Sequence, residues 1–146
     1  MNLSVIAVDK LREPYLRDGC ARISVRLEPY MSVDVVEIKP QGLRAEATSM
    51  LSRIADASAV WALDREGELL DSLHVAQRLA GVERAGTRRL TLLIGGPEGL
   101  HPSAIARADL RWSLSPLTFL HEMARLIALE QLYRAVKINR GEPYHR

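Results

Sequence analysis

Short apolar runs alternate with longer stretches of helical spacing along the chain, and this alternation constrains the fold more than any single motif. Strand-type runs are expected at Leu3–Val8, Val33–Ile38, Ala59–Leu63, Leu90–Ile94 and Leu110–Leu114. Strands that alternate with crossover helices form a mainly parallel sheet. Because several of these runs are apolar throughout, both faces of the sheet should be buried. The sequence therefore predicts a three-layer α/β/α fold with a mainly parallel sheet of five or six strands.

The stretches between the strands predict the helices that cover the sheet. Helices are expected at Pro14 to about Leu27, Ala45–Ala57, Ser72–Ala80, Ser103–Ala108 and Leu117–Arg140, and a polar turn is expected at Asp64–Gly67. The 146 residues contain no repeat and no Pro/Gly/Ser-rich linker. A chain of this length is expected to form a single domain, residues 1–146.

Composition excludes several classes of protein. The single cysteine, Cys20, excludes an internal disulfide framework, and the four histidines do not have the spacing of a zinc site. The sequence shows no signal peptide and no apolar run of about 18 residues, so a cytoplasmic protein is expected. Net charge is only +2, which is no polybasic signal, although arginines far outnumber the three lysines. Arginine suits phosphate recognition, but a GC-rich genome would produce the same bias.

The segment LLIGGPEGL, residues 92–100, is a strand followed by a glycine pair. It is neither a dinucleotide fingerprint nor a P-loop, and Pro97 removes a backbone donor. Two interpretations remain open: a plain tight turn, or a turn whose backbone approaches a flat or polar ligand closely.

A second loop, residues 113–119, follows the last predicted strand. In α/β sheets, ligands bind beyond the carboxyl ends of the strands. Loops at Leu63, Gly95 and Leu114–Phe119 would share that edge, and their neutral side chains suit an adenine ring better than a triphosphate. Ser115 and Thr118 have a simpler alternative role as N-caps of the final helix.

The final helix places His121 and Arg125 in the middle of its apolar face. Charged side chains are rarely buried without a partner. Arg125 therefore either meets a carboxylate inside the fold or borders a functional site or a subunit contact. The small residues Ala124, Ala128 and Ala135 beside it favour close helix approach, as in a dimer.

Four segments together resemble the bacterial ribosomal RNA large-subunit methyltransferase H family, a SPOUT-class enzyme that methylates N3 of a pseudouridine. In chain order they are VWALDREG, LLIGGPEGL, WSLSPLTF and LEQLYRAVKINRGEPYH. The resemblance covers nearly the whole chain. It implies a SPOUT domain with a C-terminal trefoil knot, S-adenosylmethionine as cofactor, a homodimer with a shared site, and 23S ribosomal RNA in the ribosome as substrate.

The resemblance also implies the site residues. The cofactor would contact three loops through Leu63, Gly95, Leu114, Ser115, Pro116, Leu117, Thr118 and Phe119. In the tail, His145 is the general-base candidate because imidazole titrates near neutrality, and water or a backbone carbonyl is the alternative proton acceptor. Tyr144 would orient the base, and Arg125, Arg140 and Arg146 would bind RNA phosphates. Pro116 and Leu120 depart from the residues common in relatives, which leaves the side-chain contacts at 116 open.

Three other functions remain open at this point. A SPOUT methyltransferase for another RNA, such as transfer RNA, would share the cofactor loops. A non-enzymatic ribosome-binding factor would share the fold without binding S-adenosylmethionine. A flavodoxin-like carrier is disfavoured because no phosphate loop follows the first strand.

Overall fold

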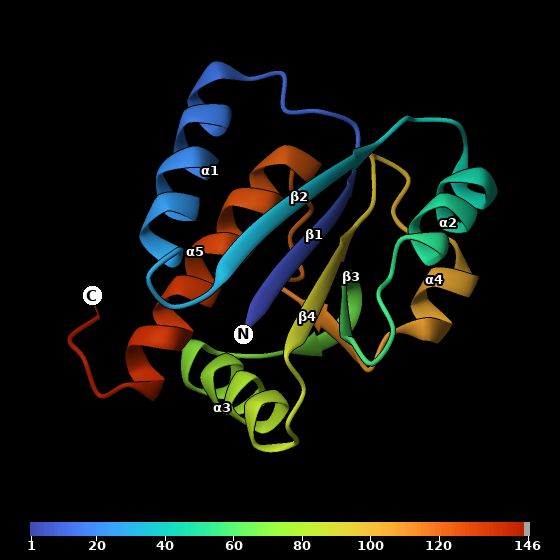
Figure 1. Cartoon of the computed structure of the whole chain (residues 1–146). Helices are drawn as coiled ribbons and strands as arrows, with labels where there is room; N and C mark the ends of the chain where they lie inside the picture. The colour runs from blue at the N-terminus through green and yellow to red at the C-terminus, as the bar shows by residue number, and fades with distance from the viewer. Residues whose placement is uncertain (145–146) are drawn as a thin grey trace.

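A computed structural model describes residues 1–144, and its centre is one parallel sheet (Figure 1). Its strands are β1 (Asn2–Val8), β2 (Ser32–Ile38), β3 (Ala59–Leu69), β4 (Arg89–Ile94) and β5 (Leu110–Ser113). They lie in the order β2-β1-β4-β3-β5, and every pairing is parallel. The predicted mainly parallel sheet is confirmed, with five strands in the described part of the chain.

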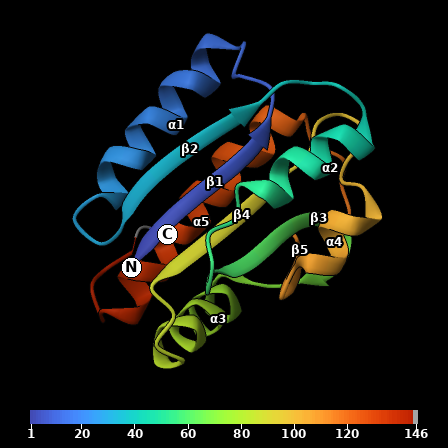
Figure 2. The same ribbon diagram turned by 45° about the vertical axis from the view of Figure 1, so that its right-hand side comes forward.

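Helices cover both faces of this sheet (Figure 2). On one face lie α1 (Pro14–Leu27), α3 (Ser72–Arg84) and α5 (His121–Asn139), and on the other lie α2 (Leu43–Ser52) and α4 (Pro102–Arg107). Each face has its own apolar core, so the central strands are buried on both sides. The three predicted layers are confirmed. Within residues 1–144, no helix is long and apolar enough to cross a membrane.

Two element boundaries differ from the prediction where the chain reaches the carboxyl edge of the sheet. The expected turn at Asp64–Gly67 is part of β3, which pairs with β5 on both sides of an irregularity. Here β3 passes so close to β5 that a Cβ on Gly67 would lie 2.4 Å from the Arg111 carbonyl oxygen. The last helix begins at His121 instead of Leu117, so residues 117–120 remain a loop.

Helices α2 and α3 also differ in extent from the prediction. The helix expected at Ala45–Ala57 runs from Leu43 to Ser52. The helix expected to stop before Gly81 continues to Arg84, and Gly86, with φ +79°, follows its end. Packing of an apolar face sustains a helix through an interior glycine that propensity alone would disfavour.

Cys20, on the inner side of α1, provides a test of this packing. The thiol is buried, and burial raises its pKa above the ordinary value. Since the thiolate is the reactive form, we expect the folded protein to react with a disulfide reagent at pH 8 about 100-fold more slowly than the urea-unfolded chain. Absorbance of the released thiolate measures both rates. Equal rates would contradict the packing of α1 against the sheet.

Candidate functional site

Two loops and a segment of β3 converge on one hollow at the carboxyl edge of the sheet. The hollow has a volume of about 540 Å³ and is lined by residues 63–66 inside β3, by the ends of β4 and β5 and the loops that follow them, and by the first turn of α5. Its walls include all the predicted cofactor-binding residues except Pro116: Leu63, Gly95, Leu114, Ser115, Leu117, Thr118 and Phe119. The fold thus brings together loops that are separated by up to about fifty residues in the sequence. We call this hollow the donor pocket.

The wall formed by residues 95–100 is a turn that closes on itself. The N–H of Gly99 donates to the carbonyl of Gly96 at 3.0 Å, and Gly99 has a φ of +81°. A Cβ on Gly95 would lie 2.2 Å from the carbonyl oxygen of Gly99. The two interpretations of this segment are therefore compatible, because a tight turn forms one wall of the pocket and its backbone faces the cavity.

The wall formed by residues 114–119 is held by hydrogen bonds from both sides. The Ser113 hydroxyl lies 2.9 Å from the carbonyl of Arg65 and 3.2 Å from that of Ser115. The Arg65 guanidinium reaches the carbonyl of Pro116 at 3.4 Å. This loop is thereby tied to Arg65 in the neighbouring strand β3.

The predicted N-capping role of Ser115 and Thr118 is wrong. The Ser115 hydroxyl accepts from the N–H of Leu117 at 3.0 Å, inside the loop. Leu120 precedes the helix and makes no side-chain cap. Because α5 begins later than expected, neither hydroxyl is at the position where it could bond the first helical N–H groups.

Charged residues that the sequence analysis did not assign to a site also line the donor pocket. Asp64, Arg65, Glu66 and Glu98 belong to its lining. The Asp64 carboxylate forms an ion pair with the Arg111 guanidinium at 2.6 Å. Within residues 1–144, Glu66 and Glu98 form no ion pair. The only sequence signal for these residues was their position next to Leu63 and Gly95.

Arg125 requires a correction. Its side chain is 4% exposed, and its guanidinium donates to the Glu37 carboxylate at 2.7 Å and to the Asp9 carbonyl at 3.0 Å. The prediction that Arg125 meets a carboxylate inside the fold is confirmed. Its assignment to RNA is wrong for this structure, because a buried and paired guanidinium is not available to a phosphate.

The predicted RNA-binding tail begins at the far end of α5. Arg140 is exposed and stacks over the Tyr30 ring, 4.8 Å from its centroid, and Tyr144 is also exposed. His145 and Arg146 lie outside the described residues. The 19 residues of α5 span about 28 Å at about 1.5 Å per residue. Because His121 lines the donor pocket at the start of that helix, Arg140 is far from the pocket of its own chain.

The comparisons with known proteins cover the whole chain. A family model described as "Predicted SPOUT methyltransferase" matches residues 1–145. The ribosomal RNA large subunit methyltransferase H of Moorella thermoacetica is 43% identical, with 100% of this chain and 99% of that protein covered. The protein of the same name from Carboxydothermus hydrogenoformans is 38% identical, with 100% of both covered.

A solved structure shares the fold at low identity. The probable methylase family protein from Haemophilus influenzae Rd KW20 has a TM-score of 0.59 over 99% of this chain and 70% of that one, at 10% identity. This similarity concerns the fold alone.

Proposed function

Because the chain belongs to the SPOUT methyltransferase family, we propose that it methylates N3 of a pseudouridine in large-subunit (23S) ribosomal RNA, with S-adenosylmethionine as the methyl donor. The observation that carries this proposal is full-length similarity to proteins named ribosomal RNA large subunit methyltransferase H. The convergence of residues 63–66, 95–100 and 114–119 on one pocket supports this proposal. Family membership also implies the C-terminal trefoil knot, and a ribosomal substrate implies a cytoplasmic enzyme.

The donor pocket fits S-adenosylmethionine in size and chemistry. Its volume is within the range of roughly 300–1,000 Å³ typical of small-molecule sites. Leu63, Leu114 and Leu117 offer apolar walls for an adenine ring, and the backbone of residues 95–99 offers polar groups for its edge. Glu66 and Glu98 suit the positive charges of the methionine part, and Arg65 suits its carboxylate. When bound, the cofactor supplies an electrophilic methyl group.

We propose that the active site is completed by a second copy of the chain. The end of α5 lies at the amino edge of the sheet (Figure 1), where Arg140 lines a hollow with Met1 and Arg88, whereas the donor pocket lies at the carboxyl edge of the same sheet. Beside the pocket, Leu117, Phe119 and Leu120 are 68%, 37% and 49% exposed. Apolar side chains gathered in this way are typical of a protein interface. A homodimer would cover them and bring the partner's tail to the pocket.

In this composite site, the chain's own residues position the RNA and remove a proton. His145 would accept the N3 proton of the pseudouridine, since imidazole is a base near neutral pH. Tyr144 would stack on the target base or orient it, and Arg140 and Arg146 would bind phosphates beside it. The apolar side chains of Leu63, Leu114 and Leu117 in the pocket wall would keep the reacting groups aligned.

One experiment tests the proposed function. Purified protein is incubated with S-adenosylmethionine labelled in its methyl group and with large ribosomal subunits, alone and within assembled ribosomes, from a strain that lacks the modification. We expect label in one pseudouridine of 23S RNA, mapped by nuclease digestion and mass spectrometry, and none in subunits that are already modified. Label in transfer RNA would indicate the alternative RNA substrate. Ribosome binding without cofactor binding would indicate a non-enzymatic factor.

The composite site predicts complementation between two inactive variants. We expect His145→Ala to lower single-turnover methylation about 100-fold or more while cofactor binding is retained. Gly95→Ala should lose the cofactor but keep an intact tail. Dimers reassembled from an equimolar mixture should recover about a quarter of wild-type activity, because half the dimers then contain one complete site. A mixture as inactive as its components would contradict the shared site, and a wild-type rate for His145→Ala alone would eliminate the base assignment.

A further inference from the structure

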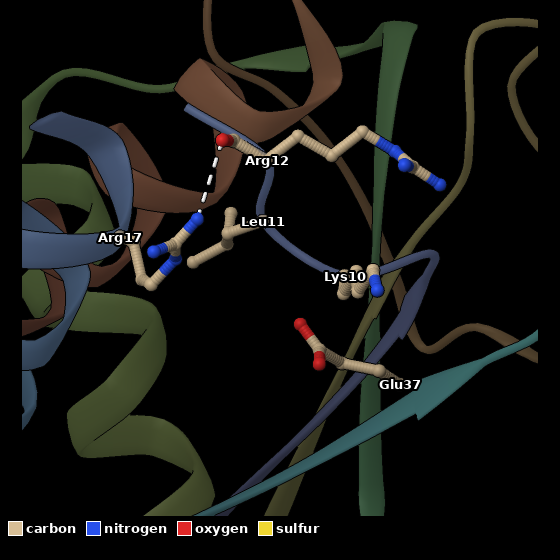
Figure 3. Close-up of a pocket in the computed structure, with 5 residues that line it drawn as sticks. All are labelled: Lys10, Leu11, Arg12, Arg17 and Glu37. Atoms are coloured by element: carbon tan, nitrogen blue, oxygen red, sulfur yellow. Dashed lines mark hydrogen bonds between the residues drawn. The ribbon is translucent and has the colours of Figure 1, made fainter. Parts of the chain in front are cut away.

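A second, basic hollow lies beside the donor pocket, at the loop between β1 and α1. It has a volume of about 530 Å³ and is lined by Lys10, Leu11, Arg12, Arg17 and Glu37 (Figure 3). Lys10, Arg12 and Arg17 are exposed. Three of its five lining residues are cationic and one is acidic.

The charges of this hollow do not cancel. Arg12 is paired with Asp9 at 3.1 Å, and the carboxylate of Glu37 is paired with the buried Arg125 at 2.7 Å. Within residues 1–144, Lys10 and Arg17 form no ion pair. The Arg17 guanidinium donates only to the carbonyl of Arg12, at 3.3 Å (Figure 3). Two cationic side chains therefore remain available to an anion.

The basic hollow and the donor pocket adjoin. β1 and β4 are neighbours in the sheet, and Ala7 pairs with Ile94, so both hollows follow the same edge. A Cβ on Gly96, in the donor pocket wall, would lie 3.2 Å from the Val8 side chain. The basic loop leaves the sheet directly after Val8. If an RNA strand places its target base at the donor pocket, the phosphates next to that base would therefore pass the loop between β1 and α1.

The first turns of α5 fix the position of the basic loop relative to the donor pocket. His121 and Ala124 line the pocket, whereas Glu122, between them in sequence, is buried and accepts the N–H of Glu13 at 3.1 Å and that of Arg12. One turn of helix thus contacts both sites. The buried Glu122 carboxylate thereby ties the basic loop to the helix that lines the donor pocket.

From this arrangement we propose that Lys10 and Arg17 bind backbone phosphates of the substrate RNA next to the methylated nucleotide. The proposal rests on the proposed function, since it takes RNA as the substrate. Phosphate contacts of this kind position a strand without reading its sequence. They are also revealed by salt, because each phosphate neutralised on a single strand contributes roughly 0.7 to the slope of log affinity against log salt concentration.

The test compares the full-length wild type with the double variant Lys10→Gln/Arg17→Gln. The KM for unmodified large subunits is expected to rise about tenfold, and the salt slope of subunit binding to fall by about 1.4, two contacts of about 0.7 each. The kcat and the calorimetric affinity for S-adenosylmethionine should stay within twofold of wild type. The variant Lys10→Arg/Arg17→Lys, which keeps both charges, should bind subunits like wild type.

The matched control is Arg53→Gln/Arg107→Gln, which removes two exposed cations next to α2 and α4, at the opposite edge of the sheet. It should change neither the KM nor the salt slope. If both double variants weaken binding equally, or if neither does, the site is overturned while methylation by the wild type still supports the proposed function. A wild type that neither methylates nor binds large subunits, alone or within assembled ribosomes, overturns the proposed function and this site together.

Discussion

Gly95→Ala is expected to lower the affinity for S-adenosylmethionine about 100-fold or more, and methyl transfer with it. The added Cβ would lie 2.2 Å from the carbonyl oxygen of Gly99 and 2.5 Å from its carbonyl carbon. These are backbone atoms of the same tight turn, so no side chain can rotate away to relieve the contact. The turn must open, and a displacement of about 1 Å in a binding site can cost about 100-fold in rate. Calorimetric titration with S-adenosylmethionine measures the affinity.

Gly81→Ala is the matched control for this prediction. Gly81 lies inside α3, and the nearest atom to an added Cβ is a terminal nitrogen of Arg84 at 3.9 Å. Alanine is favoured over glycine in a helix by up to about 1 kcal/mol, so this variant should be slightly more stable and bind the cofactor like wild type. A Gly95→Ala protein that binds S-adenosylmethionine within twofold of wild type would show that the turn does not form the cofactor site.

Arg125→Ala is expected to cause the largest loss of stability, about 2–4 kcal/mol in the free energy of unfolding. Removal of a buried partner leaves the Glu37 carboxylate and the Asp9 carbonyl without their donor. The expected loss is below the full range for buried pairs because the Glu37 side chain is 36% exposed and partly solvated. Urea unfolding followed by circular dichroism, at one fixed protein concentration, measures the change.

A second variant separates the charge from the packing of Arg125. In Arg125→Met/Glu37→Gln, a side chain of similar length fills the space and no carboxylate is left unpaired. We expect the double variant to be more stable than Arg125→Ala, since replacement of a buried pair by apolar packing is often nearly neutral. If Arg125→Ala loses less than about 0.5 kcal/mol, the pair is not a structural element and the guanidinium would be free for another role.

The sheet and its layers were predictable because strand order and burial leave a direct periodic signal. The run Leu90–Ile94 is apolar at almost every position, as a strand covered on both faces must be, and it forms β4. The boundaries at the carboxyl edge were not predictable in the same way. Residues 64–67 look like a polar turn, but they form an irregularity inside β3, because Leu63 and Glu68 on either side of them both pair with Trp112 of β5. Tertiary pairing overrides local polarity there.

The candidate site was partly predictable. Parallel pairing brings the carboxyl ends of β4 and β5 to one edge, and Leu63 lies at that edge because the pairing of β3 with β4 ends at Ala62, so the convergence of Leu63, Gly95 and Leu114 followed from topology. The charged residues around these positions could not be inferred from topology. Arg125 has the same spacing on a helical wheel whether it faces RNA or a buried carboxylate, and only the position of Glu37, 88 residues away, decides between them. A role for the loop at Lys10 could likewise be inferred only from its contacts with residues distant in sequence, such as Glu122.

The most direct test of this account is a crystal structure of the protein grown with S-adenosylmethionine. The account predicts a dimer in which the cofactor contacts Leu63, Gly95 and the loop 114–119 of one chain, with the tail of the other chain beside it. Cofactor density away from these three loops, or a pocket lined by the tail of its own chain, would contradict the account.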